Sequence, residues 1–246
     1  MWQQTSVCSR RLDRQIAEGG FCSLGGGDLG QPTYARSVLF TPRWTFRPAE
    51  VPKPEARDAV EAFLKAQGGA GLVTFGSMVL QPETVAACLE WIRGNPGRPV
   101  VVMDGTSKLK NELAAGLQAS TPDHVLILVG ECPHSWLFPK MDWLVCHGGI
   151  GTTTLALRSR LPTIIVPCVA DQEATMLDLY DRGLTVRMPA AIKVTAAMLE
   201  VGVTILLRDH SAAWADAPEA EDVDYGAIEH FITKHSATGR YEGFDG

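Results

Sequence analysis

From about residue 55 to residue 209 the sequence alternates short apolar runs with segments of helical periodicity. Runs such as GLVTFGS at 71–77 and HVLILVG at 124–130 are apolar at most consecutive positions, so a sheet built from them must be covered on both faces. Parallel strands joined by crossover helices meet that requirement. The pattern therefore predicts an α/β fold, with a Rossmann-like, doubly wound parallel sheet of six strands and helices on both faces.

The alternation places six strands and six main helices. The strands are expected at 71–77, 99–105, 124–130, 142–149, 162–168 and 184–188. The helices are expected at 55–67, 82–94, 107–120, 152–160, 171–183 and 195–209, followed by a terminal amphipathic helix at 225–235. Glycine-rich text predicts a flexible extension at 1–37, and a proline-containing run predicts a linker at 38–54. The folded domain is therefore expected to occupy 55–246.

Charge and composition exclude several classes of partner. The chain has 28 acidic and 22 basic residues and a formal net charge of -6, which disfavours binding to nucleic acid or to an anionic lipid surface. No window approaches the roughly 18 apolar residues of a spanning helix, and the N-terminus lacks the apolar core of a secretory signal. Six cysteines without a CxxC pair are expected to stay reduced. These features predict a cytoplasmic protein, at most peripheral to a membrane.

Two glycine-bearing turns are expected to meet at one edge of the sheet. In the strand order 3-2-1-4-5-6, the crevice for ligands opens between the first and fourth strands. The first strand ends in FGS at 75–77 and the fourth in HGGIGT at 147–152. Glycines let backbone N–H groups approach an anion, and the helix that follows adds its positive end. The spacing therefore predicts a phosphate site, with His147 as a hydrogen-bond donor.

Other interpretations of the same residues stay open at this point. His147 can be a strand-end histidine satisfied by backbone groups, and the glycines can form a tight turn that binds nothing. Ser77 can cap the backbone at its strand end. An NAD site is disfavoured, because FGSMVLQ lacks the GxGxxG spacing after the first strand. Only Asp104, an acidic residue at the end of the second strand, matches the dinucleotide-binding pattern.

A zinc site is also disfavoured. Cys132 and His134 are expected in a loop, whereas Cys146 and His147 are adjacent on a strand, where neighbouring side chains point to opposite faces. The cysteines are better explained as small core residues. The sequence therefore indicates no metal.

Four motifs together resemble one enzyme family. The segments FGSM, PHSWLFPKMDWLVCHGGIGTT, LPTIIVP and ADQ occur in this order. They resemble the C-terminal, donor-binding half of GT-B UDP-glycosyltransferases, in the branch of sterol glucosyltransferases and bacterial antibiotic glycosyltransferases, whose signature is similar to PHDWLFP, HHGGAGTT and DQ. The likeness covers about 38–207 and is densest over 132–172.

The resemblance implies roles for particular side chains. His147, Gly151 and Thr152 would hold the diphosphate of a UDP-sugar, and Asp171 and Gln172 would hold sugar hydroxyls. Ser77 would contact the phosphates from across the crevice, and His134 and Trp136 would lie near uracil and ribose. The residues implied to bind the UDP-sugar are Ser77, His134, Trp136, His147, Gly148, Gly149, Gly151, Thr152, Asp171 and Gln172.

Two of these residues have a second interpretation. Asp171 can also be the N-terminal cap of its helix, and the two roles are compatible. Trp136 can equally be an aromatic core residue. The sequence also departs from the family pattern, with Leu155 where plant members have a ribose-binding glutamate, Cys146 for the first of the paired histidines, and Ile150 for a small residue between the glycines.

By resemblance, the expected reaction is inverting transfer of a hexose, with glucose the expected sugar, from UDP to a sterol-like or other lipophilic alcohol. UDP-glucose would be a co-substrate, and no cofactor is implied. No side chain is a convincing catalytic base, so an N-terminal acceptor domain or a partner protein is expected to supply it. Two alternatives stay open: a non-catalytic nucleotide-sugar-binding module, such as a truncated paralogue, and a structural subunit that binds nothing.

Overall fold

The computed structural model describes residues 20–21, 41–42, 51–103, 112–118, 120–128 and 132–215. The chain divides into one unit of Met1–Thr45 with Ala220–Gly246 and a second unit of Phe46–Glu219. In the first unit, β1 (Gly20–Phe21) and β2 (Thr41–Pro42) form a short antiparallel pair. Most of the expected extension at 1–37 and linker at 38–54, and all of the expected helix at 225–235, lie outside the described residues.

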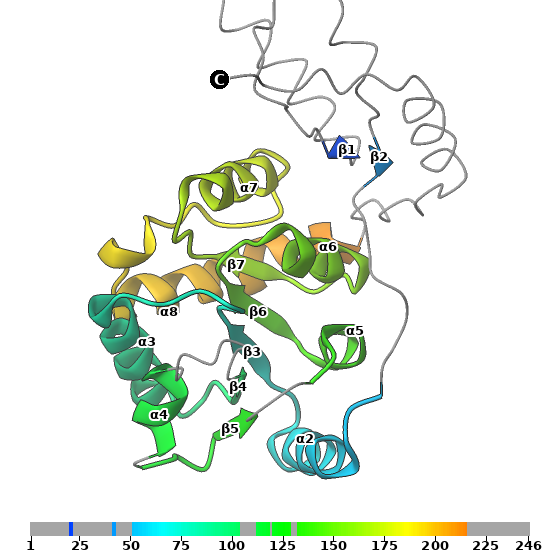
Figure 1. Ribbon diagram of the computed structural model, residues 1–246, viewed down its shortest axis with the longest axis vertical. Coiled ribbons are helices and arrows are strands. Elements are labelled where there is room, and N and C mark those ends of the chain that lie inside the picture. The colour runs from blue at the N-terminus through cyan, green and yellow to red at the C-terminus, as the bar shows by residue number, and fades with distance from the viewer. Residues whose placement is uncertain are drawn as a thin grey trace, which may run out of the picture. The chain divides into compact units, whose positions relative to one another are not determined.

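The second unit contains a parallel sheet of five strands in the order β5-β4-β3-β6-β7 (Figure 1). Every strand pairs in parallel with its neighbours, and almost every strand residue is buried, as the consecutive apolar runs predicted. The doubly wound α/β prediction is therefore confirmed. The strands are β3 (Gly71–Thr74), β4 (Val100–Met103), β5 (Val125–Leu128), β6 (Trp143–Cys146) and β7 (Thr163–Ile165).

The expected sixth strand at 184–188 is wrong, because side chains occupy the groups that a strand would use for pairing. The segment runs beside β7, but its contact is a hydrogen bond from the Thr185 hydroxyl to the Thr163 carbonyl, at 2.6 Å. The Leu184 carbonyl accepts from the indole N–H of Trp214 at 2.5 Å. Among the described residues, no backbone ladder joins this segment to the sheet.

All six expected helices of this unit are present. α3 packs against α4 and α8, α5 packs against α6, and Figure 1 shows the two groups on opposite sides of the sheet. The expected helices are α2 (Pro54–Gln67), α3 (Pro82–Gly94), α4 (Glu112–Gln118), α6 (Ile150–Arg158), α7 (Ala170–Asp181) and α8 (Ala196–Ile205). The additional turns are α5 (His134–Leu137), η2 (Phe138–Lys140), η3 (Ala191–Lys193), η4 (Leu206–His210) and α9 (Ser211–Ala215).

The helix ends follow local sequence signals. Proline occupies the first turn of α2 and of α3, where its missing N–H costs nothing. α2 ends at Gly68, whose φ of 75° is left-handed and whose N–H donates to the Leu64 carbonyl. The segment around 134–140, expected as a loop, instead winds into α5 and η2. Within the described ranges, no helix is long and apolar enough to cross a membrane.

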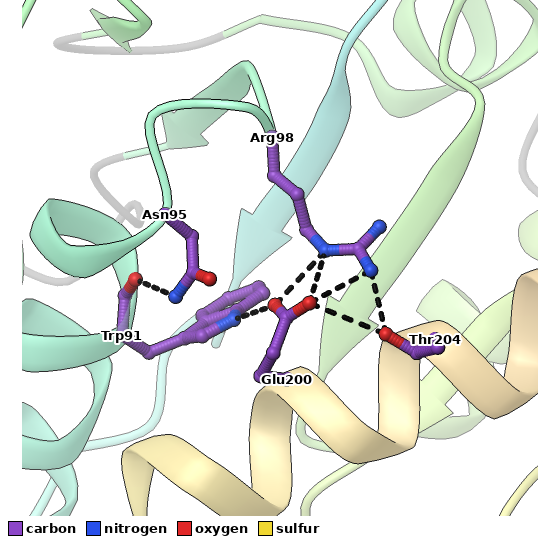
Figure 2. Close-up of polar contacts among 5 residues, drawn as sticks. All are labelled: Trp91, Asn95, Arg98, Glu200 and Thr204. Atoms are coloured by element: carbon purple, nitrogen blue, oxygen red, sulfur yellow. Dashed lines mark hydrogen bonds and ion pairs between the residues drawn. The ribbon is translucent and has the colours of Figure 1, made fainter.

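A polar cluster joins α8 to the end of α3 and the loop after it (Figure 2). The Glu200 carboxylate accepts from Arg98 Nε at 2.8 and 2.9 Å and from the indole N–H of Trp91 at 3.0 Å. The Arg98 guanidinium also donates to the Thr204 hydroxyl at 2.6 Å, and Asn95 donates to the Trp91 carbonyl. Partial burial raises the pKa of Glu200, but the hydrogen bonds and the Arg98 charge outweigh it, so the net pKa is lowered. The cluster therefore favours the ionised carboxylate in the folded state.

Glu200→Gln is expected to lower the free energy of unfolding by ~1 to 2 kcal/mol at pH 7, because it removes the charged acceptor of the cluster. A depressed folded-state pKa stabilises the fold above the unfolded pKa, and this contribution is lost as the pH falls through the folded value. The stability difference from the unchanged protein should therefore shrink below about pH 4.5. Urea denaturation across pH measures it. Glu90→Gln, on the exposed face of α3, is the control. An equal pH-dependent change in that variant would contradict the stabilising role of the ionised Glu200 carboxylate.

Candidate functional site

The candidate site lies where the strand order reverses direction. β3 and β6 are adjacent and in parallel register, with Thr74 opposite Cys146 at their carboxyl ends. The chain crosses from β3 to β4 on one side and from β6 to β7 on the other, so the loops after β3 and β6 diverge at this point. The two glycine-bearing turns therefore end side by side, as the spacing predicted.

The turn after β3 is held by its own backbone and by a threonine. The Met78 N–H donates to the Phe75 carbonyl at 3.0 Å, and Gly76 adopts a φ of 57°. The Gly76 N–H donates to the Thr74 hydroxyl at 3.3 Å. Thr74 thus makes the backbone contact that Ser77 was considered for, and the exposed Ser77 hydroxyl has no partner within the described part of the chain.

Two glycines of the β6 turn are required by the fold itself. Gly148 has a φ of 89°, and a Cβ there would lie 2.5 Å from Cγ2 of Ile165. Gly149 is the N-cap of α6, and a Cβ there would collide with the ring of His147. These glycines therefore let the chain turn sharply from strand to helix.

No steric contact within the described part of the chain requires glycine at position 151. Gly151 is exposed at the second position of α6, its φ is not left-handed, and a Cβ there would meet nothing within 4 Å. No side chain caps this helix end, so the backbone N–H groups of its first turn have no partner in the helix. Thr152, the next residue, is buried. The helix end therefore offers free donors beside open space.

His147 lies between the two turns. Its side chain is only 9% exposed, and Nδ1 has no hydrogen-bond partner among the described residues. A Cβ on Gly76 would be 3.0 Å from the His147 ring, so the β3 turn packs directly against it. Burial lowers the pKa of His147, and the nearby Asp171 carboxylate opposes that shift only in part. A buried ring nitrogen without a hydrogen-bond partner is unusual in folded proteins and marks His147 as a candidate site residue.

The N-terminus of α7 contributes Asp171 and Gln172. Asp171 is exposed and close enough to affect the pKa of His147. Gln172 is 4% exposed, and its amide oxygen accepts from the N–H groups of Cys168 and Val169 at 2.8 and 3.2 Å. Gln172, rather than Asp171, therefore caps this helix. The cap interpretation of Asp171 is wrong, because the N-cap position is Val169.

His134 and Trp136, both on α5, have different surroundings. The His134 ring stacks on Phe138, with centroids 4.8 Å apart and planes at 25°. Burial lowers the pKa of His134, and the nearby His147 lowers it further, so both rings belong to one neighbourhood. Trp136 packs against the core with Lys140 Nζ 4.7 Å from its ring centroid, which supports its interpretation as a core aromatic.

The described cysteines are free thiols in the core or at its edge. Cys88 and Cys146 are fully buried, and burial raises the pKa of each thiol to about 12. Cys168 is partly buried, and burial raises its pKa to about 11. These thiols are therefore protonated at neutral pH, and the region described contains no cluster of three His, Cys, Asp or Glu side chains arranged for a metal ion.

Comparison with curated proteins finds glycosyltransferases. A sterol 3-beta-glucosyltransferase of Arabidopsis thaliana is 36% identical over 130 residues, which are 52% of this chain and 20% of that protein. A sterol 3-beta-glucosyltransferase of Candida albicans is 30% identical over 166 residues, which are 66% of this chain and 11% of that protein. The chain thus spans about a fifth or less of the length of these relatives. No protein-family model matches.

Comparison with solved structures finds the same fold in GT-B glycosyltransferases. The glycosyltransferase of kitacinnamycin matches with a TM-score of 0.53 and 21% identity, over 79% of this chain and 44% of that one. Medicago truncatula UGT71G1, complexed with UDP-glucose, matches with a TM-score of 0.53 and 14% identity, over 70% of this chain and 40% of that one. The family resemblance seen in the sequence motifs is confirmed by these findings.

The two kinds of glycine in the β6 turn predict opposite results for stability. Gly148→Ala should lower the free energy of unfolding by ~1 to 3 kcal/mol, because alanine resists the left-handed φ and its methyl group meets Ile165. Gly151→Ala should leave stability unchanged or raise it by up to about 1 kcal/mol, because the methyl group meets nothing and alanine favours the helix. Urea denaturation compares the two, and equal losses would show that Gly151 is also needed by the fold.

Proposed function

We propose that this chain binds a UDP-sugar and takes part in inverting hexosyl transfer. The chain is homologous to sterol 3-beta-glucosyltransferases and has the fold of GT-B glycosyltransferases. The observation that carries this proposal is the pairing of His147 with the α6 N-terminus. The His147 ring lies against Gly149, the N-cap of α6, and its Nδ1 has no hydrogen-bond partner among the described residues. The N–H groups of the first turn of α6 and an imidazole N–H can each donate to an acceptor, and a diphosphate supplies several acceptors.

Gly151 supports a close approach of the phosphates. The chain gives no steric reason for glycine there, whereas a ligand lying on the α6 backbone would leave no room for a side chain. The exposed Ser77 hydroxyl on the neighbouring β3 turn adds a donor from the other side. Gly148 and Gly149 allow the tight turn from β6 to α6, and Thr152 lies in the first turn of α6.

The remaining parts of the donor are assigned to neighbouring elements. We assign sugar hydroxyls to the Asp171 carboxylate, which is exposed and acts electrostatically on His147. His134 shares that neighbourhood and is assigned to the nucleoside, together with Trp136 of the same helix, which packs against the core. The UDP-glucose complex of a structural neighbour favours glucose as the sugar.

In the reaction, this site would stabilise the departing UDP. Negative charge grows on the diphosphate as the glycosidic bond to UDP breaks, and the α6 N–H groups and His147 would stabilise that charge by donating hydrogen bonds to it. We propose that the acceptor site and the base for the acceptor hydroxyl come from an acceptor-binding domain or a partner chain. The much greater length of the relatives supports this. Their names favour a sterol-like or other lipophilic alcohol as acceptor.

Titration calorimetry with UDP tests the proposal, with a matched pair of glycine variants. Gly151→Ala should weaken UDP binding about tenfold or more, because its methyl group blocks approach to the helix backbone. Gly97→Ala is the control. It also adds a methyl group to open space, but at the other end of the sheet, ahead of β4. Equal affinities in all three proteins, or no UDP binding by the unchanged chain, would overturn the site.

His147→Ala should also weaken UDP binding about tenfold, because it removes a buried hydrogen-bond donor to the diphosphate. His210→Gln is the control, since that histidine bonds the Gly183 carbonyl, away from the turns. UDP release from UDP-glucose with lipophilic alcohols, measured with an added acceptor-domain protein, separates a transferase from a non-catalytic binding module. Binding without release under any of these conditions would favour the module.

A further inference from the structure

The two glycine turns hold the His147 ring. A Cβ on Gly149 would lie 2.4 Å from Nε2 of the ring, and a Cβ on Gly76 would lie 3.0 Å from its Cε1. Both turns therefore touch the imidazole directly, and His147 is only 9% exposed. The ring has little freedom to rotate toward another partner, so its two nitrogens stay in different surroundings.

The two ring nitrogens of His147 differ in what they can contact. Nε2 is the ring atom nearest to Gly149, the N-cap of α6, so it lies beside the helix end at which the diphosphate is proposed to bind. Nδ1 is buried and has no hydrogen-bond partner among the described residues. A proton on Nδ1 would therefore be a buried N–H without an acceptor, which folded proteins rarely tolerate. An imidazolium carries that proton, and so does one of the two neutral tautomers.

The titratable groups around the ring do not change this preference. Asp171 on α7 raises the pKa of His147, but burial outweighs it, so the pKa is lowered overall. His134 on α5 is a second ring of the same neighbourhood, and burial and His147 lower its pKa. Burial raises the pKa of the Cys146 thiol to about 12 and that of the Cys168 thiol to about 11, so both are uncharged. The β3 turn and the first turn of α6 contain no titratable side chain.

We propose that His147 meets the diphosphate as a neutral imidazole with its proton on Nε2, so that the donor binds without proton uptake at this ring. The inference rests on the proposed function and adds the protonation state of its histidine. The geometry that carries it is the buried Nδ1 without a partner, the position of Nε2 beside the α6 N-terminus, and the two turns that hold the ring.

Nitrogen-15 NMR of the histidine rings reads the protonation state directly. The two nitrogens of a neutral ring differ in chemical shift, whereas both nitrogens of an imidazolium carry a proton and resonate close together. The spectrum of His147→Gln identifies the His147 signals by their absence. At pH 7 the proton should be on Nε2 in the free chain and with saturating UDP-glucose. A proton on Nδ1 in the free chain, or an imidazolium in the complex, would overturn the proposal.

Calorimetry with UDP-glucose counts the protons that binding takes up. Both phosphates of UDP-glucose carry two substituents, so neither has the second proton that a terminal phosphate loses at about pH 6. Titration in two buffers of different ionisation enthalpy should show an uptake below about 0.2 protons per UDP-glucose at pH 7. The dissociation constant should change less than about twofold between about pH 6.5 and 8. A weakening of about tenfold per pH unit over this range would contradict a neutral ring.

His147→Gln and His147→Asn form a matched pair of neutral donors. The amide nitrogen of glutamine can reach the position of Nε2, whereas that of asparagine reaches only the position of Nδ1. The glutamine variant should therefore bind UDP-glucose about tenfold more tightly than the asparagine variant. Equal affinities in two variants that unfold at the same urea concentration would contradict donation from Nε2. Failure of the unchanged chain to bind UDP-glucose would refute the proposed function, whereas the NMR spectrum of the free chain would still decide the tautomer.

Discussion

The parallel pairing of β3 with β6 is the interaction on which the site depends. Their register brings Thr74 and Cys146 level at the carboxyl edge, so the turns that follow emerge as neighbours although they are some seventy residues apart in sequence. The Gly76 turn then packs against the His147 ring. A change of register would move every strand residue to the other face and would separate the two turns, so the same hydrogen bonds that build the core also assemble the site.

The glycines divide the β6 turn into a part that the fold requires and a part that it does not. Gly148 and Gly149 are needed because Ile165 and His147 leave no room for side chains, and Gly148 also has a left-handed backbone. Gly151 meets no such constraint and weakens its helix relative to alanine. The fold therefore gives no reason for glycine at this position, whereas the proposed contact with a diphosphate does.

Periodicity predicted most of the fold, and the order of the strands predicted that the two glycine-bearing turns are neighbours, because both depend on local sequence and on general rules of parallel sheets. The prediction of a sixth strand was wrong because the indole N–H of Trp214, thirty residues away, donates to the Leu184 carbonyl. The residue type of Asp171 allowed a second interpretation as the cap of α7, whereas in the structure Gln172 accepts from two backbone N–H groups at this helix end. Such choices depend on tertiary contacts that no local pattern contains.

The charge balance of the site follows from the same geometry. The segments 75–78, 147–152 and 168–173 contain no lysine or arginine, and α7 brings in the Asp171 carboxylate. Burial lowers the pKa of His147, which keeps the free imidazole neutral near pH 7. Within these three segments, a diphosphate would therefore be stabilised by backbone N–H groups and the α6 dipole, and not by lysine or arginine side chains. Such donors are held by the backbone and need little reorganisation as charge develops on a bound group.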